Sequence, residues 1–316
     1  MAKQAKKLFD LHCDTLYEAL RQNKRLGSND LNISFERLRS YDSFTQVLAM
    51  WSDSRVDDDM AFRRFKEARE LLEKELLDSP DVVLCTSDTE LRAAESAGKN
   101  SVFLAVEGGK LLSDDLCRLD ELYNDGVRFL TLVWDKVCRL GGAHDTDEGL
   151  TDFGRKAVNR CFELGIIPDL SHASDKMISE VIEMADSAGR VCIATHSNSR
   201  AVCRHTRNLT DENFNAIVSL GGIVGVSLAP MHLTENYRER CSVDDIIDHI
   251  EHYIALGGEN AVCLGCDLDG VAMLPDGISS VSDLSKIADR MKERGLGAMI
   301  DKLFYSNARD FVSRKM

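Results

Sequence analysis

Short apolar runs alternate with amphipathic segments along almost the whole chain. The runs are rich in Val, Ile, Leu and Phe and end in polar or charged residues, which is typical of buried parallel strands. In the segments between them, apolar residues recur every three or four positions, which is typical of helices that pack one face against a core. The strands expected from this pattern are residues 8–12, 44–51, 102–107, 127–134, 166–171, 191–196, 223–228 and 262–267.

The amphipathic segments predict helices with recognisable beginnings. In the segment 62–76, for example, Phe65, Leu72 and Leu76 fall on one helical face. Short polar residues precede four other segments, as helix N-caps do, and these are Thr151, Ser174, Thr210 and Ser242. Further helices are expected over residues 114–124, 152–164, 175–186, 210–220, 242–256 and 281–293.

This alternation of strands and helices predicts an α/β fold with a parallel sheet. Eight such units in 316 residues match the size of a closed (β/α)8 or TIM barrel. Because no Pro/Gly/Ser-rich stretch divides the chain, we expect residues 1–316 to form a single domain. An open, doubly wound sheet is the alternative, although the Gly-Gly pairs of the chain form neither a GxGxxG nor a P-loop motif.

Composition narrows the classes of partner and the compartment. The formal net charge of −14 repels phosphate backbones and anionic lipid surfaces, so we expect neither nucleic acid nor a membrane as a partner. The basic start, residues 1–7, leads into a strand rather than a long apolar core, which predicts no secretory signal. The ten cysteines are expected to be buried free thiols in a reducing, cytoplasmic setting. Cys263 and Cys266 have the spacing of a redox motif but are expected to pack in the core.

The triplet His12-Cys13-Asp14 ends the first apolar run. Because alternate side chains of an extended segment point the same way, His12 and Asp14 share one face while Cys13 faces the opposite side. An imidazole beside a carboxylate suits a divalent transition metal, above all zinc. A histidine that is merely hydrogen-bonded to an aspartate has the same spacing, so the triplet alone does not decide between the two.

Four more of the expected strands end in residues that can bind a metal. These residues are Glu107, His172, His196 and Asp267. In a barrel, the C-terminal ends of the strands meet at one rim, where the active sites of this fold lie. Five strands that each bring His, Asp or Glu to the same rim favour a metal site over chance placement.

Three histidines and three carboxylates are more than one zinc ion uses, because a catalytic zinc takes about three protein ligands. We therefore expect two zinc ions per chain. Glu107 is the best candidate for a carboxylate that bridges them, with a hydroxide shared between the ions. The remaining ligands divide between the ions as His12 with Asp14 and His172 with His196. Asp267 is then free to handle protons.

A series of ordered motifs adds a second kind of signal. The motifs are His12-x-Asp14, Glu107-Gly108-Gly109, Arg128-Phe129-Leu130-Thr131-Leu132, Gly149-Leu150-Thr151-Asp152-Phe153-Gly154, Asp169-Leu170-Ser171-His172, Thr195-His196-Ser197-Asn198, Arg207-Asn208-Leu209-Thr210-Asp211, Gly221-Gly222-Ile223-Val224-Gly225 and Gly265-Cys266-Asp267-Leu268-Asp269-Gly270. Together they resemble the zinc-dependent membrane (renal) dipeptidase family and its bacterial relatives, over nearly the whole chain.

The resemblance implies a barrel with a binuclear zinc site that hydrolyses the peptide bond of dipeptides. The implied ligands are His12, Asp14, Glu107, His172 and His196, with Glu107 as the bridge. The resemblance also implies that Arg207 binds the substrate, that Asp267 is the acid/base and that the protein is a homodimer. The guanidinium of Arg207 suits substrate binding, because a dipeptide presents a carboxylate one residue from the scissile bond. Whether a D-residue is accepted at the C-terminal position is left open.

One position departs from the family pattern. In the mammalian enzymes a histidine that polarises the scissile carbonyl follows the strand ending Leu130-Thr131-Leu132, whereas this chain has Trp134. An indole donates one hydrogen bond but cannot carry a proton. His144, in the following loop, is a candidate substitute, so Trp134 and His144 are both counted as substrate-binding candidates. The secretory signal and lipid anchor of the animal enzymes are also not expected here.

Other assignments remain open. An amidohydrolase acting on N-acyl amino acids, cyclic amides or other small esters and amides is the alternative enzyme, but that group favours a carboxylated lysine as the bridge. A metal-storing or peptide-binding barrel without activity is the non-enzymatic alternative, and it has no need of Asp267. His249 and His252 are expected on a solvated helix face. His205 is expected with equal weight either to support a metal ligand or to lie at the rim of the site. Two positions are open for His232, which follows a strand end: the mouth of the substrate site or, as the favoured alternative, an ordinary loop.

Overall fold

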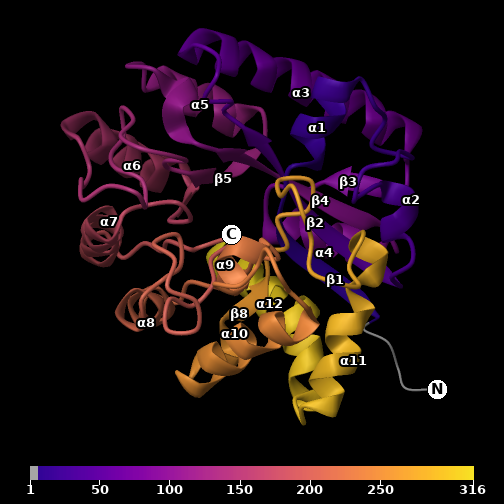
Figure 1. The fold of residues 1–316 in the computed structure, drawn as a ribbon. Helices are drawn as coiled ribbons and strands as arrows, with labels where there is room; N and C mark the ends of the chain where they lie inside the picture. The colour runs from indigo at the N-terminus through magenta and orange to yellow at the C-terminus, as the bar shows by residue number, and fades with distance from the viewer. Residues whose placement is uncertain (1–5) are drawn as a thin grey trace.

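A curled sheet of parallel strands occupies the centre of the molecule, and helices surround it (Figure 1). The computed structural model describes residues 6–316. Residues 1–5 lie outside this range, so the expectation of no secretory signal, which rests on residues 1–7, falls partly outside the described residues. None of the helices in residues 6–316 combines the length and the apolar character that crossing a bilayer requires.

The strands pair in the order β6-β5-β4-β2-β1-β8-β7, and β3 pairs with β4. Their bounds are β1 Lys7–Cys13, β2 Ser43–Trp51, β3 Val82–Leu84, β4 Asn100–Glu107, β5 Val127–Thr131, β6 Ile167–Asp169, β7 Val224–Val226 and β8 Val262–Leu264. Every pairing is parallel. The predicted α/β class with a parallel sheet is therefore confirmed, in the form of a curled half-barrel.

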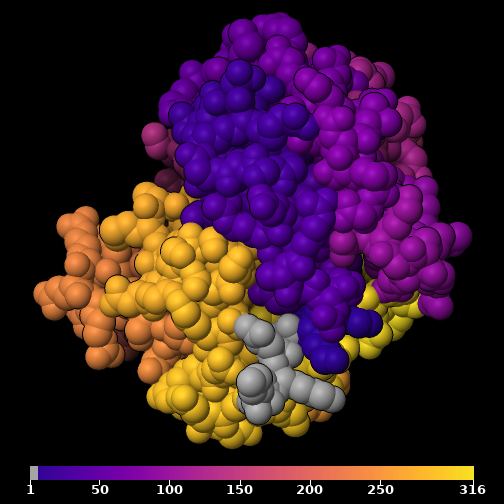
Figure 2. Space-filling view, turned by 90° about the vertical axis from the view of Figure 1, so that its right-hand side faces the viewer, coloured from indigo at the N-terminus to yellow at the C-terminus, as the bar shows by residue number. Residues whose placement is uncertain are grey.

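The first and the last strand of the chain lie side by side, because β1 pairs with β8. Figure 2 shows the indigo N-terminal part of the surface in contact with the yellow C-terminal part. The first strand therefore has a neighbour from the start of the chain, β2, and one from its end. This pairing brings the residues that follow β1 close to those that follow β8.

The segment 191–196 is a correction to the predicted strands. Ile193 and Ala194 make only single parallel bridges, to Asp169 at the end of β6 and to Val224 in β7. The next two backbone N–H groups donate to side chains: that of Thr195 to Asp169 Oδ1 at 2.9 Å and that of His196 to a serine hydroxyl at 3.1 Å. Side-chain acceptors thus replace the ladder hydrogen bonds. The short β3 was not predicted, because three residues carry little periodicity.

The predicted helices are present, with ends that differ by a few residues. The helix bounds are α1 Thr15–Gln22, α2 Phe35–Leu38, α3 Asp58–Asp78, α4 Asp88–Ser96, α5 Cys117–Asn124, α6 Asp152–Leu164, α7 Asp175–Ser187, α8 Asp211–Ser219, α9 Pro230–Leu233, α10 Val243–Ala255, α11 Ser285–Glu293 and α12 Asn307–Lys315. The hydroxyls of Thr151, Ser174 and Thr210 accept hydrogen bonds from N–H groups of the first turn, as caps do. Ser242 donates its N–H to Asp245 at the start of α10.

Two apolar clusters lie on the two faces of the sheet. In β2, Val47 and Ala49 belong to one cluster, whereas Leu48 and Met50 belong to the other, as the period of two requires. The first cluster, which we call the inner cluster, also holds Phe103 of β4 and strand residues such as Phe9, Phe129, Ile193 and Cys263. The second, outer cluster joins the sheet to the helices. Both Cys263 and Cys266 are buried free thiols, as predicted. The expectation that all ten cysteines are buried is wrong for Cys117, which is exposed, and for Cys138, which is partly exposed.

His249 corrects the expectation of a solvated face on α10. Its imidazole is fully buried. Nδ1 accepts from Ser199 N–H at 3.0 Å, and Nε2 donates to the carbonyl of Leu233 at 2.9 Å. Burial lowers the pKa of His249 to about 4. In the sequence, a buried histidine that hydrogen-bonds to two other segments cannot be distinguished from an exposed histidine on a polar helix face, so His249 was expected to be exposed. His252, on the same helix, is partly exposed and pairs with Asp211.

We expect His249→Asn to flatten the pH dependence of stability. The unfolded chain protonates this imidazole as the pH falls through about 6.5, whereas the folded protein resists protonation until about pH 4, so stability is lost as the pH falls. Between about pH 7.5 and about pH 5 the loss amounts to about 2 kcal/mol. Urea unfolding at both values measures it, with His252→Asn as the control. An unchanged difference between the two pH values in His249→Asn would contradict the assignment.

Candidate metal centre

The end of β1 turns His12 and Asp14 toward the same space. The register of β1 with β2 shifts between Asp10 and Cys13, and such an irregularity re-aims the side chains next to it. Leu11 packs in the inner cluster, whereas Cys13 packs in the outer cluster. His12 and Asp14 are both buried, on the side opposite to Cys13. The residue between the two candidate ligands therefore serves the packing of the helices.

The other candidate ligands continue inward-facing positions or follow left-handed turns. Glu107 ends β4 two residues after Ala105, which lies in the inner cluster. His172 and Asp267 lie in the loops that follow β6 and β8, with φ angles of 71° and 59°. A residue other than glycine with a positive φ is uncommon and is found preferentially at functional sites. The left-handed turns direct both side chains back over the end of the sheet.

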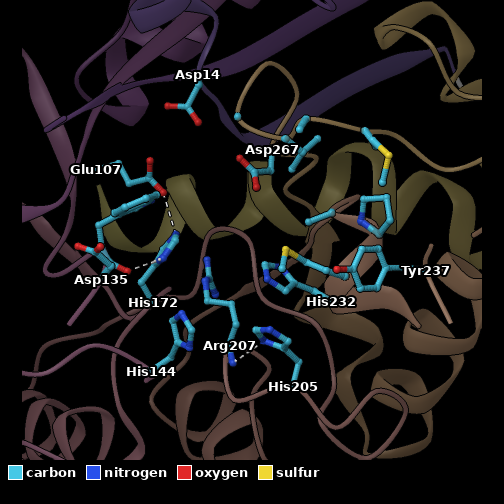
Figure 3. Close-up of a pocket in the computed structure, with 18 residues that line it drawn as sticks. Asp14, Glu107, Asp135, His144, His172, His205, Arg207, His232, Tyr237 and Asp267 are labelled. Carbon is cyan, nitrogen blue, oxygen red and sulfur yellow. Dashed lines mark hydrogen bonds and ion pairs between the residues drawn. The ribbon is translucent and has the colours of Figure 1, made fainter. Parts of the chain in front are cut away.

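Five ligand-type side chains meet in one buried cluster (Figure 3 shows three of them: Asp14, Glu107 and His172). Glu107 Oε1 lies 2.9 Å from His172 Nε2, 3.3 Å from His196 Nε2 and 3.8 Å from His12 Nε2. Asp14 Oδ2 lies 3.9 Å from His12 Nε2. Two groups, each with ligand atoms within 4.8 Å of one another, share Glu107: His12 with Asp14, and His172 with His196.

The three imidazoles of the cluster face one another through unprotonated nitrogen atoms. His172 Nδ1 donates to the carbonyl of Trp134 at 2.9 Å. Nδ1 of His196 lies 2.8 Å and Nδ1 of His12 lies 3.3 Å from the hydroxyl of Thr195. A neutral imidazole has one N–H, so this hydrogen-bond network assigns it to Nδ1 in each case and leaves Nε2 as a lone pair. Nε2 of His172 and Nε2 of His196 are only 3.0 Å apart, which favours a cation between them.

The carboxylates of the cluster point to the same conclusion. Burial, and then the nearby carboxylates, raise the pKa of Asp14 and of Glu107 well above the usual range. Among the described residues, Asp14 Oδ1 and His12 Nε2 are buried without a hydrogen-bond partner. A bound dication satisfies such atoms and removes the repulsion between the carboxylates. Imidazole and carboxylate ligands together fit zinc.

A layer of hydroxyl and carboxylate groups supports the histidines from below. The hydroxyl of Thr195 donates to Asp169 Oδ2 at 2.6 Å, so its lone pairs accept from the Nδ1–H groups of His12 and His196. Asp169 Oδ2 also accepts from Thr131 at 2.6 Å. This support was not predicted. Its only signal was the period of two, which places Thr195 and Asp169 inward two residues after Ile193 and Ile167.

Asp267 lies beside the cluster and shares a backbone neighbour with Asp14. A Cβ at Gly270 would collide with Oδ2 of Asp14 and Oδ1 of Asp267, so both carboxylates lie against a position where only glycine fits. Burial raises the pKa of Asp267 to about 7, although Arg207 opposes the shift. Asp267 also forms a group with His12 and His196 whose ligand atoms lie within 4.8 Å of one another. The geometry thus places a carboxyl group at the open side of the cluster.

The cluster opens into a cavity of about 480 Å³ (Figure 3). Arg207 lies buried in its wall, with Nη1 donating to Ser197 at 2.9 Å, while Nε and Nη2 have no partner among residues 6–316. His144 and Trp134, the two other substrate-binding candidates, line the same cavity. The ring centre of His144 is 6.4 Å, and that of Trp134 is 6.0 Å, from the ring centre of His172. Every candidate named from the sequence is therefore at the cluster or in its cavity.

Two further histidines, His205 and His232, lie in the wall of the cavity. His232 lies in α9 and lines the cavity, so the less favoured of its two expected positions is confirmed and the ordinary loop is wrong. His205 lines it as well, and its ring centre lies 4.7 Å from that of His232 and 5.7 Å from that of His144. His205 lies in the loop after the bridging residue Ala194, and His232 lies in α9 after β7. Position after a strand end was the only signal for them in the sequence.

The chain is similar to known proteins along almost its whole length. The family model described as membrane dipeptidase, peptidase family M19, matches residues 2–310. Dipeptidase 3 of Homo sapiens is 30% identical over 305 residues, which cover 91% of this chain and 60% of that protein. The chain thus spans about 60% of the length of this relative.

Two solved structures share the fold along almost the whole chain. One is a dipeptidase AC, a metallo peptidase of family M19, with a TM-score of 0.90, 26% identity and 99% of both chains covered. The other is a metallo peptidase from Rhodobacter sphaeroides liganded with a phosphinate mimic of the dipeptide L-Ala-D-Ala. Its TM-score is 0.89 at 26% identity, and 99% of this chain and 100% of that chain are covered.

We expect Thr195→Val to weaken zinc binding by about 10- to 100-fold, because the acceptor that fixes Nδ1–H on two candidate ligands is lost. Thr195→Ser retains the hydroxyl and is expected to bind zinc with nearly the affinity of the wild-type protein. Competition with a chromophoric chelator measures the affinities, and thermal unfolding of the metal-free proteins controls for folding. Equal affinities in Thr195→Val and the wild type would remove this role from Thr195.

Proposed function

This chain belongs to the membrane dipeptidase family, peptidase family M19, and on that basis we propose that it is a zinc-dependent dipeptidase. One observation carries the proposal: a buried cluster of imidazole lone pairs and carboxylates opens into the same cavity as an arginine whose Nε and Nη2 are free within residues 6–316. A metal site and a carboxylate site that share one cavity suit a short peptide. The solved relatives of this family, described as dipeptidases or bound to a dipeptide mimic, support the assignment.

The proposed metal site holds two zinc ions. Its ligands are His12 and Asp14 for one ion, His172 and His196 for the other, and Glu107 for both. The support is that the two ligand groups have Glu107 as their common member. When bound, the two ions would supply a water activated at neutral pH and positive charge for the oxygen of the scissile carbonyl.

The residues of the chain position the substrate and move the proton. Arg207 binds the C-terminal carboxylate through Nε and Nη2, the edge of the guanidinium that matches a carboxylate. Asp267 takes the proton of the attacking water and returns it to the departing amine nitrogen. Its place at the open side of the cluster supports this role, since it touches both the metal site and the cavity. The products are the two free amino acids.

His144 is the proposed donor to the scissile carbonyl, in place of the family histidine that Trp134 replaces. Its Nδ1 is held by the hydroxyl of Thr206 at 2.9 Å, which leaves Nε2 for the cavity. Trp134 contributes in a different way: its carbonyl orients His172, and its indole packs on Trp51 with 4.8 Å between ring centres. We therefore assign Trp134 to the wall of the substrate site rather than to proton transfer.

Several broader expectations remain proposals. We propose one domain and a closed (β/α)8 barrel, in which residues 191–195 fill the place between β6 and β7 through the bridges of Ile193 and Ala194. A homodimer is proposed from the family, and a reducing, cytoplasmic compartment from the ten free cysteines. A D-residue at the C-terminal position is also proposed, supported by the mimic bound to the Rhodobacter sphaeroides protein.

The function is tested with Asp267→Asn. We expect the purified wild type to contain about two zinc ions and to hydrolyse dipeptides, and Asp267→Asn to keep the metal while kcat falls by about 10²- to 10⁴-fold, because the proton carrier is lost. Metal analysis and a dipeptide-hydrolysis assay measure both. Asp289→Asn, a change at a surface ion pair, is the control. Full turnover in Asp267→Asn would refute the role of Asp267, and no hydrolysis by the zinc-loaded wild type would refute the function.

Glu107→Gln tests the two-metal arrangement. An amide is a weaker ligand than a carboxylate, and it has no negative charge with which to bridge two cations. We therefore expect the zinc content to fall from about two to about one or less per chain. Metal analysis after gel filtration measures the content, with the neighbouring-loop variant Asp114→Asn as the control. Two zinc ions retained at wild-type affinity would rule out Glu107 as the bridge.

A further inference from the structure

We propose that the preferred substrate is a dipeptide whose C-terminal residue has an acidic side chain, aspartate or glutamate, which His205 and His232 bind beside Arg207. The proposal rests on the proposed dipeptidase function and names the substrate class of the same cavity. It rests on the number of hydrogen-bond donors around Arg207, which is larger than one carboxylate can use.

Arg207 alone accounts for the α-carboxylate. Arg207 is 4% exposed, and its Nη1 already donates to Ser197. The free atoms, Nε and Nη2, form one bidentate edge, and a single carboxylate saturates it. The carboxyl end of a dipeptide therefore needs no further donor from the wall.

The imidazoles of His205 and His232 remain available beside this edge. His205 Nδ1 accepts the backbone N–H of Arg207 at 3.1 Å, so the proton of this ring is on Nε2, which is free to donate. Neither ring nitrogen of His232 has a hydrogen-bond partner within the part of the chain that the structure describes. The two ring centres are 4.7 Å apart, and both rings line the cavity. A substrate that leaves these donors unpaired loses free energy when it displaces their water.

The C-terminal residue is the part of a dipeptide that reaches these donors. Its side chain and its α-carboxylate share one Cα, so a group next to Arg207 lies within reach of that side chain. The other residue lies across the scissile bond, toward the metal cluster, where Asp14, Glu107 and Asp135 line the cavity (Figure 3). Asp14 and Glu107 are assigned to the proposed metal ions, so Asp135 is the carboxylate left to disfavour an acidic side chain at the N-terminal position. The cavity thus has donors at one end and acids at the other.

The alternative is a preference for a dipeptide with an apolar C-terminal side chain, because Met231 and Met273 also line the cavity. Their exposed fractions, 44% and 53%, place them at its mouth, in contact with solvent. The imidazoles lie next to the buried guanidinium instead. Burying a hydrogen-bond donor without a partner costs more free energy than leaving a methionine at the mouth partly exposed to water. The imidazole donors therefore determine which C-terminal side chain is preferred.

A matched dipeptide series tests the preference. Ala-Asp, Ala-Asn and Ala-Leu, each with an L- and a D-residue at the second position, compare a charge, an amide of the same shape and an apolar group. With the zinc-loaded protein we expect kcat/KM for the better Ala-Asp isomer to exceed that for the matching Ala-Asn by at least about tenfold, the effect of one charge-assisted hydrogen bond. Ala-Asn or Ala-Leu equal to or better than Ala-Asp would overturn the proposal.

His232→Leu tests the residues assigned to the side chain. We expect its ratio of kcat/KM for Ala-Asp over Ala-Asn to fall to about threefold or less, because a donor to the acidic group is lost. His252→Leu removes an imidazole that lies on α10 and pairs with Asp211, and its ratio should match that of the wild type. A wild-type ratio in His232→Leu would remove His232 from the site.

Binding of free amino acids separates this proposal from the proposed function. Aspartate carries both carboxylates on one residue, and asparagine carries one, so calorimetry with each compares the sites without any hydrolysis. We expect aspartate to bind at least about tenfold more tightly, and less selectively in His232→Leu. Selective binding without hydrolysis would refute the dipeptidase and support the anion site. Hydrolysis with equal binding of the two amino acids would do the reverse.

Discussion

Three imidazole nitrogens without protons face one another in a buried cluster, and this electrostatic constraint governs the rest of the site. Nδ1 of each histidine is used as a donor, so Nε2 of His12, His172 and His196 present lone pairs toward Glu107. Lone pairs and carboxylates at these distances repel one another unless positive charge lies between them. The fold therefore holds an arrangement whose natural occupant is a divalent metal, and the neighbouring groups are arranged around that requirement.

The parallel sheet makes this arrangement possible. Its inner face is apolar as far as Phe103, Ile167 and Ile193, and the next inward positions carry Thr195 and Asp169, which hold the histidines by hydrogen bonds. The segment 191–196 gives up ladder hydrogen bonds to make these contacts. Irregular backbone thus appears where the ligands are oriented, while the regular strands below provide the rigid support that a metal site requires.

The charges of the cavity wall are also separated, with negative groups near the metal cluster and a positive group opposite. Carboxylates surround the metal cluster, whereas the opposite wall carries Arg207, His205 and His232. Because Arg207 is buried without a carboxylate partner within residues 6–316, its charge is left for a ligand. The membership of the chain in the membrane dipeptidase family and the polarity of this cavity are consistent with a short peptide whose carboxyl end faces the arginine. Trp134 and His144 line the same cavity.

The sequence by itself determined the α/β class, most strands and helices, the helix caps and the family, and it singled out the residues that converge in the cluster. It did so because the period of two fixes which side chains face inward, and because parallel strands bring their C-terminal ends to one edge, so that His12, Glu107 and Asp267 were expected together. Only the tertiary structure decided that His249 is buried, that Thr195 and Asp169 orient the ligands, that 191–196 bonds to side chains, and that His232 reaches the cavity. These features depend on contacts between loops and strands far apart in the chain, and a loop has no periodicity from which such contacts can be read.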